Sequence, residues 1–178
     1  MHTLDGLMIK LRRSDILATT KYLVIGLDEQ KYAIELNSIN GIEKQYVIVP
    51  VPEGPEFIKG IIHLRDQIVP IYNLKKRFGL LSRAAQDAQV LISDTHGMKL
   101  GIEVDVVYGI VELDENEIKD MPRVAKNEDS EYFEKIIKVS VNGSKEQIVI
   151  CVNVDDLMSD EEFDLVSKSL DSASSDEE

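Results

Sequence analysis

Apolar and polar residues alternate along most of residues 21–152, and clusters of polar turn residues divide this stretch into short segments. A period of two is typical of β-strands that bury one face. Two such segments joined by a short polar turn predict a β-hairpin. The pattern predicts four hairpins, whose paired strands are 22–27 with 31–36, 57–64 with 67–74, 90–94 with 98–104, and 136–141 with 147–152.

The segments between and after these hairpins are less regular. Residues 42–51 are rich in β-branched side chains and predict a further strand, as do residues 109–113. Acidic residues at 155–156 and 160–162 are well placed for helix N-termini and predict short C-terminal helices. The expected organisation is an N-terminal arm at 1–20, a folded domain at 21–158, and an acidic helix at 159–178 with a disordered tail from residue 171.

The two halves of the chain resemble each other. The similar segments are 33–36 with 101–104 and 41–42 with 109–110 at an offset of 68, 59–61 with 135–137 at an offset of 76, and 68–73 with 148–153 at an offset of 80. One half holds about five short strands, which are too few to bury a core alone. We therefore expect a mainly β fold of two small five-stranded barrels that share a core.

Charge narrows the range of partners. The 178 residues carry a net charge of −13, and residues 155–178 hold ten of the acids against the single base Lys168. A phosphate backbone or an anionic membrane needs a basic surface, so nucleic-acid binding is not expected. The run Lys75-Lys76-Arg77 is interpreted as a solvated turn. No apolar run approaches the length of a membrane span, and no signal-peptide pattern is present, so we expect a cytoplasmic protein without membrane insertion.

Catalytic chemistry finds little support in the sequence. An enzyme on a barrel scaffold needs titratable groups that converge in a cleft. Glu35 and Glu103 occupy equivalent repeat positions and are the candidate pair, although strand alternation favours a plain solvent-facing role for both. Cys151 lies in an apolar strand and is expected to be buried and unreactive, and His63 is expected on a hairpin surface. We therefore expect no catalytic residue, no metal site and no cofactor.

Residues 55–78 read PEFIKGIIHLRDQIVPIYNLKKRF. This segment resembles the hallmark of the CheW-type chemotaxis coupling proteins, the CheW-like domain family, whose common pattern is PxFIKGVxNLRGxIVPIxDLRxxF. The similarity covers roughly residues 21–158. It implies two interlocked SH3-like five-stranded β-barrel subdomains around one core, in agreement with the internal repeat.

The resemblance also implies a function. The expected role is a non-enzymatic adaptor that couples chemoreceptors to a histidine autokinase in a signalling array. Its implied partners are the CheW-like regulatory domain of the kinase and the cytoplasmic tip of the receptors, which would recruit it to membrane receptor arrays. Two alternatives stay open: an adaptor of a kinase pathway unrelated to motility, and a nucleic-acid-binding barrel protein, which the charge and the 6% aromatic content disfavour.

Position by position, the resemblance nominates six partner-binding residues. Ile39 matches an apolar groove position of the family, and Gly41 stands where an acid is common. The other four residues match the hallmark segment and are Phe57, Ile58, Gly60 and Arg65. Each has a plainer alternative, because the first two could be core residues, Gly60 could serve close strand packing, and Arg65 could solubilise a turn. The sequence departs from the hallmark at His63, Asp66 and Asn73.

Overall fold

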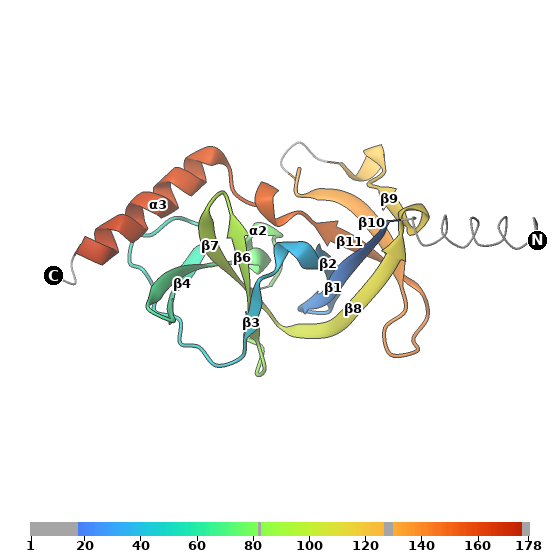
Figure 1. Cartoon of the computed structure of the whole chain (residues 1–178), viewed down its shortest axis with the longest axis horizontal. Helices are drawn as coiled ribbons and strands as arrows, with labels where there is room; N and C mark the ends of the chain where they lie inside the picture. The colour runs from blue at the N-terminus through green and yellow to red at the C-terminus, as the bar shows by residue number, and fades with distance from the viewer. Residues whose placement is uncertain (1–17, 82, 127–129, 176–178) are drawn as a thin grey trace, which may run out of the picture.

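The computed structural model describes residues 18–81, 83–126 and 130–175, and across these residues the strands form two sheets (Figure 1). Sheet A has six strands in the order β8 (Val106–Asp114), β1 (Thr19–Leu27), β2 (Gln30–Glu35), β11 (Gln147–Val152), β10 (Phe133–Val139) and β9 (Ile118–Asp120). Sheet B has five strands in the order β3 (Gly41–Glu43), β6 (Gln89–Thr95), β7 (Met98–Val104), β5 (Gln67–Tyr72) and β4 (Ile58–Leu64). The mainly β prediction is confirmed, and the extra strand of sheet A is the short edge strand β9.

Short helical segments connect the strands. They are the 3₁₀ turns η1 (Leu36–Ser38), η2 (Glu115–Glu117), η3 (Arg123–Ala125) and η4 (Val154–Asp156), the single-turn helix α2 (Leu74–Arg77), and the longer helix α3 (Asp160–Ser175). The prediction of disorder from residue 171 is wrong for residues 171–175, which continue α3. Leu170 still packs against the core and the Ser172 hydroxyl donates to the Lys168 carbonyl oxygen, so the helical contacts reach beyond the apolar pattern. Residues 176–178 and most of the predicted N-terminal arm lie outside the described residues.

The four predicted hairpins are confirmed as β1–β2, β4–β5, β6–β7 and β10–β11. The predicted strand over residues 42–51 is wrong. Only Gly41–Glu43 forms a strand there, followed by one isolated bridge between Val49 and Ile61. Pro50 follows the bridge and has no N–H group to donate, so the ladder ends after a single pair.

The repeat is real, and its two copies exchange strands. Val24 of β1 pairs with Gly109 of β8, and Ile92 of β6 pairs with Gly41 of β3. The two pairs are equivalent, because the offset of 68 relates Val24 to Ile92 and Gly41 to Gly109. Sheet A therefore combines β1 and β2 from the first half of the chain with β8–β11 from the second, while sheet B combines β3–β5 with β6 and β7. The strands of sheet B, β3 to β7, are consecutive in the sequence between Gly41 and Val104, whereas the strands of sheet A come from both sides of this segment.

One offset in the predicted repeat needs correction. Gly60 pairs with Ile71 in the β4–β5 hairpin, and Lys135 pairs with Cys151 in the β10–β11 hairpin. The equivalent of Gly60 is thus Lys135, which makes the offset 75 and not 76. The register shift lies between Ile58 and Gly60 in the first hairpin and between Phe133 and Lys135 in the second, which are equivalent positions. The two hairpins therefore align, although the match of Lys59 with Lys135 in sequence suggested an alignment that differs by one residue.

A shared core joins the two sheets. Fully buried side chains from both sheets form its largest cluster, including Ile25 and Ile34 of sheet A and Leu91 and Ile102 of sheet B. Each sheet also has a smaller cluster of its own, one of which contains Ile137. The predicted shared core is confirmed, because one cluster of buried side chains draws residues from both sheets.

A buried ion-pair network also ties the subdomains together. The ammonium of Lys75 in α2 lies 2.9 Å from a carboxylate oxygen of Asp28 and 2.8 Å from one of Asp105. Asp28 lies in the β1–β2 turn and Asp105 lies between β7 and β8. The Lys75 side chain is only 11% exposed, so its interpretation as part of a solvated turn is wrong. Burial acts to lower the pKa of Lys75, but the hydrogen bonds that its ammonium donates to the two carboxylates outweigh this effect, and the net pKa is raised.

Candidate partner-binding site

Arg65 lies at the tip of the β4–β5 hairpin. Leu64 pairs with Gln67, so Arg65 and Asp66 form a two-residue loop, and their φ values are +47° and +67°. Two positive φ values are the signature of a type I′ turn, whose twist suits a hairpin. Both side chains are exposed, and within residues 18–81, 83–126 and 130–175 they form no ion pair with each other. The Arg65 guanidinium is thus presented to solvent by the turn.

Gly60 occupies a position where a side chain does not fit. An added Cβ would lie 2.7 Å from Cγ2 of Ile48 and still closer to the carbonyl oxygen of Val49. The backbone of Val49 bridges to Ile61 through hydrogen bonds of 2.8 and 2.9 Å. Glycine here lets the 48–49 segment approach β4, which is a packing role.

Phe57 and Ile58 lie at the opposite end of β4 from Arg65. Both are half-buried and pack against the shared core, and Phe57 contacts Tyr72 with ring centroids 6.1 Å apart. At about 3.3 Å per residue, Ile58 and Arg65 are roughly 20 Å apart along the strand. The hallmark residues therefore sit at two ends of one hairpin.

Ile39 and Gly41 lie at the seam between the two halves. Ile39 ends η1 and packs against the shared core, and Gly41 begins β3 opposite Ile92 of β6. The space around Gly41 is open, since an added Cβ would meet nothing within 4 Å. Of the six nominated residues, Ile39, Phe57 and Ile58 share the central core, while Arg65 and Gly41 are placed elsewhere.

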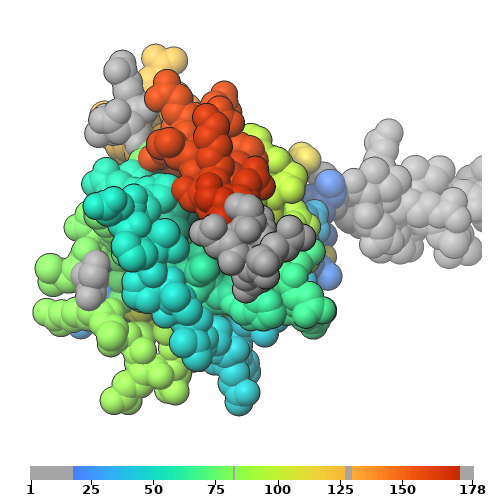
Figure 2. Space-filling model, turned by 90° about the vertical axis from the view of Figure 1, so that its left-hand side faces the viewer, coloured from blue at the N-terminus to red at the C-terminus, as the bar shows by residue number. Residues whose placement is uncertain are grey.

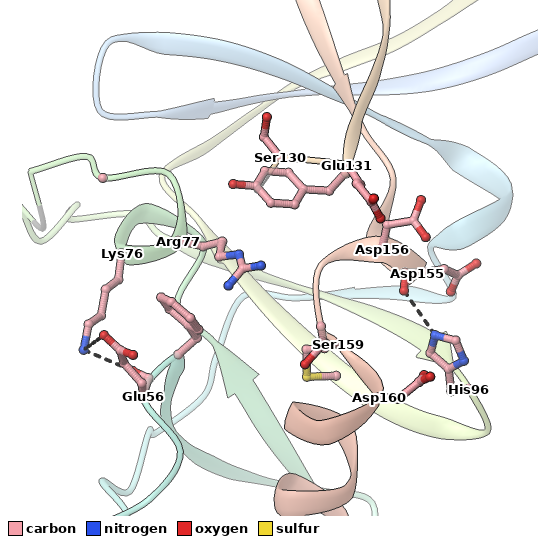
Figure 3. A pocket seen from close by; sticks show the side chains of 14 residues that line it. Glu56, Lys76, Arg77, His96, Ser130, Glu131, Asp155, Asp156, Ser159 and Asp160 are labelled. Atoms are coloured by element: carbon pink, nitrogen blue, oxygen red, sulfur yellow. Dashed lines mark hydrogen bonds and ion pairs between the residues drawn. The ribbon is translucent and has the colours of Figure 1, made fainter. Parts of the chain in front are cut away.

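A large cavity lies between the subdomains and was not foreseen from the sequence. It measures about 950 Å³, and α2 faces the segment that runs from η4 into α3 across it (Figure 3). Acidic side chains predominate in its lining, and the acidic and basic lining residues are Glu56, Lys76, Arg77, His96, Glu131, Asp155, Asp156 and Asp160. Phe57 also lines it and is the one nominated residue that reaches this space.

Arg77 is the central cation of this cavity. Its guanidinium carbon lies 4.8 Å from the ring centre of Phe57 and 5.4 Å from that of Tyr132. The guanidinium also pairs with a carboxylate oxygen of Glu162 in α3 at 3.5 Å. These contacts are typical of a stacked arginine, so the solvated-turn interpretation fails for Arg77 as well. The basic run was visible in the sequence, but its aromatic partner at 132 is 55 residues away and gave no local signal.

Burial shifts the pKa values of two titratable groups that take part in the packing of the fold. Burial raises the pKa of the Tyr72 hydroxyl, which donates a 2.9 Å hydrogen bond to the carbonyl oxygen of Leu157. Burial likewise raises the pKa of the Cys151 thiol to about 12, and Cys151 is buried as predicted. The candidate pair Glu35 and Glu103 is split between sheets, and Glu103 instead accepts a hydrogen bond from Tyr46 and pairs with Lys59.

Metal-binding and membrane-spanning features are absent from the described residues. In the part of the chain that the structure describes, no group of three or more His, Cys, Asp or Glu side chains is arranged to hold a metal ion. None of the described helices is long and apolar enough to cross a membrane. The candidate binding features of the described residues are thus exposed surfaces, a polar cavity and exposed turns.

Comparison with known proteins gives the context of these surfaces. The family model for the CheW-like domain matches residues 21–162. The chain belongs to the CheW-like domain family. The chemotaxis protein CheW of Thermotoga maritima is 30% identical over 105 residues, which cover 59% of this chain and 70% of that protein. The chemotaxis protein CheW of Klebsiella aerogenes is 28% identical over 147 residues, which cover 82% and 86%.

A solved structure supports the same assignment. The scaffolding protein TtCheW from Thermoanaerobacter tengcongensis superposes with a TM-score of 0.69 at 31% identity, covering 80% of this chain and 89% of that one. The CheW-like fold therefore consists of the two SH3-like subdomains described above. One departure from the hallmark is conservative, because Asn73 accepts a hydrogen bond from the Lys76 N–H as the N-cap of α2, a role that Asn and Asp fill equally well.

Proposed function

We propose that this protein is an adaptor that couples chemoreceptors to a histidine autokinase in a chemotaxis signalling array. The observation that carries the proposal is the match of the CheW-like domain across residues 21–162, which spans both subdomains. The relatives are named chemotaxis protein CheW, and TtCheW is described as a scaffolding protein. We infer that the protein works in the cytoplasm at receptor arrays, without catalysis and without a cofactor.

An adaptor must hold two partners at once, and the strand exchange supports this. Ile42 of β3 is 41% exposed, and its repeat equivalent Ile110 of β8 is 57% exposed. Large apolar side chains on exposed strands are common features of protein contacts. The proposed partners are the CheW-like domain of the kinase and the cytoplasmic tip of a receptor. Each subdomain then offers one comparable surface for them.

Arg65 is the proposed contact residue with the clearest test. The side chain is exposed on a tight turn and makes no ion pair with any described residue, so its removal should change the free energy of unfolding by less than about 0.5 kcal/mol. Truncation of an arginine that is an interface hot spot costs about 2 kcal/mol or more of binding free energy. We expect Arg65→Ala to leave urea unfolding unchanged and to weaken binding to a kinase or receptor fragment at least about tenfold.

Asp66→Gly is the matched control for this experiment. Glycine accepts the φ of +67° without strain and is the usual residue of the hallmark. It also removes the neighbouring negative charge, so binding through Arg65 should persist or strengthen. If Arg65→Ala leaves binding unchanged both in the wild type and in the Asp66→Gly variant, Arg65 does not belong to the interface. Failure of wild-type protein to bind either partner would overturn the adaptor function itself.

A further inference from the structure

Two of the nominated partner-binding residues are covered by the chain's own C-terminal helix. Phe57 and Ile58 line a hollow together with Val166 of α3, which is only 3% exposed. Figure 2 shows α3, in red, lying across the surface of the segment coloured cyan to green. A partner that used Phe57 and Ile58 would therefore meet α3 first.

The surface beneath α3 is an apolar groove. We call it the α3 groove and define its floor by five residues at the open end of sheet B: Val51, Pro55, Ile58, Ile61 and Pro70. The helix fills it incompletely. A hollow of about 210 Å³ remains on one side of Val166 and one of about 50 Å³ on the other. Unfilled apolar space weakens packing, because lining atoms lose contacts that a tighter fit would supply.

Apolar side chains of α3 contact the body along one stripe of its described part. Phe163, Val166 and Leu170 pack against the shared core, and of these only Val166 is buried. The pairing of Glu162 with Arg77 at 3.5 Å is longer than a good charge-assisted hydrogen bond. Leu165 remains 57% exposed beside the larger hollow. Elements with few buried apolar contacts open at low free-energy cost.

We propose that the α3 groove is a docking site for an acidic amphipathic helix of a partner, and that α3 occupies it until that helix displaces it. The occupant within the chain defines the chemistry of the ligand. Apolar side chains at the spacing of Phe163, Val166 and Leu170 fill the groove, and a carboxylate just before the first of them pairs with Arg77. The proposal rests on the adaptor function, since it specifies how one partner engages.

A helical ligand suits this surface better than an extended one. An added strand would need a free edge on β4, but the backbone of Val49 already occupies that edge opposite Ile61. The stripe from Phe163 to Leu170 spans about 10 Å at 1.5 Å per residue, which a short amphipathic helix covers with two turns. Arg77 supplies the positive charge at one end of the groove, so an acidic helix is favoured over a basic one.

The test uses a labelled peptide of residues 159–175 as the probe helix and the full chain as its receptor. In the wild type, α3 competes with the peptide, so the apparent affinity is reduced by the fraction of molecules with a free groove. Val166→Asp places a charge at the buried position of Val166 and should release the helix. Lys168→Asp introduces the same residue at an exposed position of α3 and is the control. We expect the peptide to bind Val166→Asp at least about tenfold more tightly than the wild type or Lys168→Asp.

Two further variants keep the test decisive. Ile58→Asp, combined with Val166→Asp, alters the groove floor and should abolish peptide binding. Glu162→Gln removes the carboxylate partner of Arg77 while keeping the apolar stripe, and should raise peptide affinity about threefold even if Val166→Asp fails to fold. Equal peptide binding by the wild type and Glu162→Gln, with hydrogen exchange showing α3 released, would overturn the proposal. If kinase and receptor fragments still bind in that case, the adaptor function stands and only the groove assignment is lost.

Discussion

The two subdomains share the same pairing of their central strands but differ at the edges of their sheets. In sheet A, β9 pairs with three residues of β10, including Lys119 opposite Ile136. In sheet B, the equivalent of that pair is the single bridge between Val49 and Ile61. Sheet B carries α3 over its open end, and its β4–β5 turn has only two residues, whereas residues 140–146 join β10 to β11. The differences lie where strands end and loops begin.

This comparison separates what the core requires from what it permits. The central pairings, such as Ile71 with Gly101 and Cys151 with Ala33, are equivalent because both place the same parallel contact in the core. Edges and turns face solvent and are less constrained by packing, so they can differ without loss of the fold. The candidate contact residues Arg65 and Phe57 are at such edges in sheet B. Sheet B therefore differs from sheet A where the proposed contact residues lie.

The largest effect is expected when the ion-pair network that joins the two subdomains is broken. Lys75→Met leaves Asp28 and Asp105 close together and largely buried without their cation, and removal of one partner of a buried ion pair costs about 3–5 kcal/mol. We expect the free energy of unfolding to fall by about 3 kcal/mol in urea denaturation. Lys76→Met is the control, because Lys76 is half exposed and its 3.9 Å pairing with Glu56 contributes about 0.5 kcal/mol at most.

A second change tests whether sheet B is the more tightly packed at its hairpin. Gly60→Ala should lower the free energy of unfolding by about 2 kcal/mol, because the new methyl group meets Ile48 and the Val49 backbone. Its repeat equivalent in sheet A is Lys135, where a long side chain is already present. Gly41→Ala has open space and should change stability by less than about 0.5 kcal/mol. Similar losses for both glycines would show that the close approach at Gly60 is not needed.

The smallest expected effect is a pH dependence of the free energy of unfolding that comes from sheet A and not from sheet B. Cys151 of sheet A has its pKa raised by burial from 9.0 to about 12, whereas its repeat equivalent in sheet B is Ile71, which does not titrate. Above about pH 9 the unfolded chain loses the thiol proton and the folded chain keeps it, so stability falls as pH rises towards 12. Between about pH 8 and pH 10 this costs about 1 kcal/mol. Cys151→Val should lose this part of the alkaline destabilisation in paired urea titrations, and an unchanged pH dependence would mean that the thiol does not contribute.

Local patterns in the sequence were sufficient for the hairpins and the repeat. Turn residues such as Asn142-Gly143 and the alternation around them depend on neighbours in sequence, so β10–β11 could be predicted directly. The offsets of 68 and 80 survive in the structure because they mark core strands. The offset of 76 failed because it aligned residues of the same type, Lys59 with Lys135 and Ile61 with Ile137, whereas the ladders make Ile61 equivalent to Ile136.

Features that depend on distant contacts were not predictable in this way. The strand exchange of β3 and β8 follows from which sheet each strand joins, and two similar apolar strands give no indication of that choice. Lys75 and Arg77 looked solvated because their partners Asp105 and Tyr132 come later in the chain. Helix α3 extends to Ser175 and packs on the body through Val166 and Leu170, which its acidic composition concealed. Of the candidate site, the turn position of Arg65 was predicted, but the cover over Phe57 and Ile58 was not.

The exchanged strands have a consequence for synthesis of the chain. When residues 1–88 have left the ribosome, sheet A has only β1 and β2, and sheet B lacks the β6–β7 hairpin that joins β3 to β5. Sheet A gains its last core strand only when β11 is made at Gln147–Val152. Pairings of high sequence separation form slowly, and apolar strands remain without partners until then. Closure of sheet A therefore depends on the final quarter of the chain, and a product that ends before residue 147 has every strand of sheet B but lacks β11, which joins β2 to β10 in sheet A.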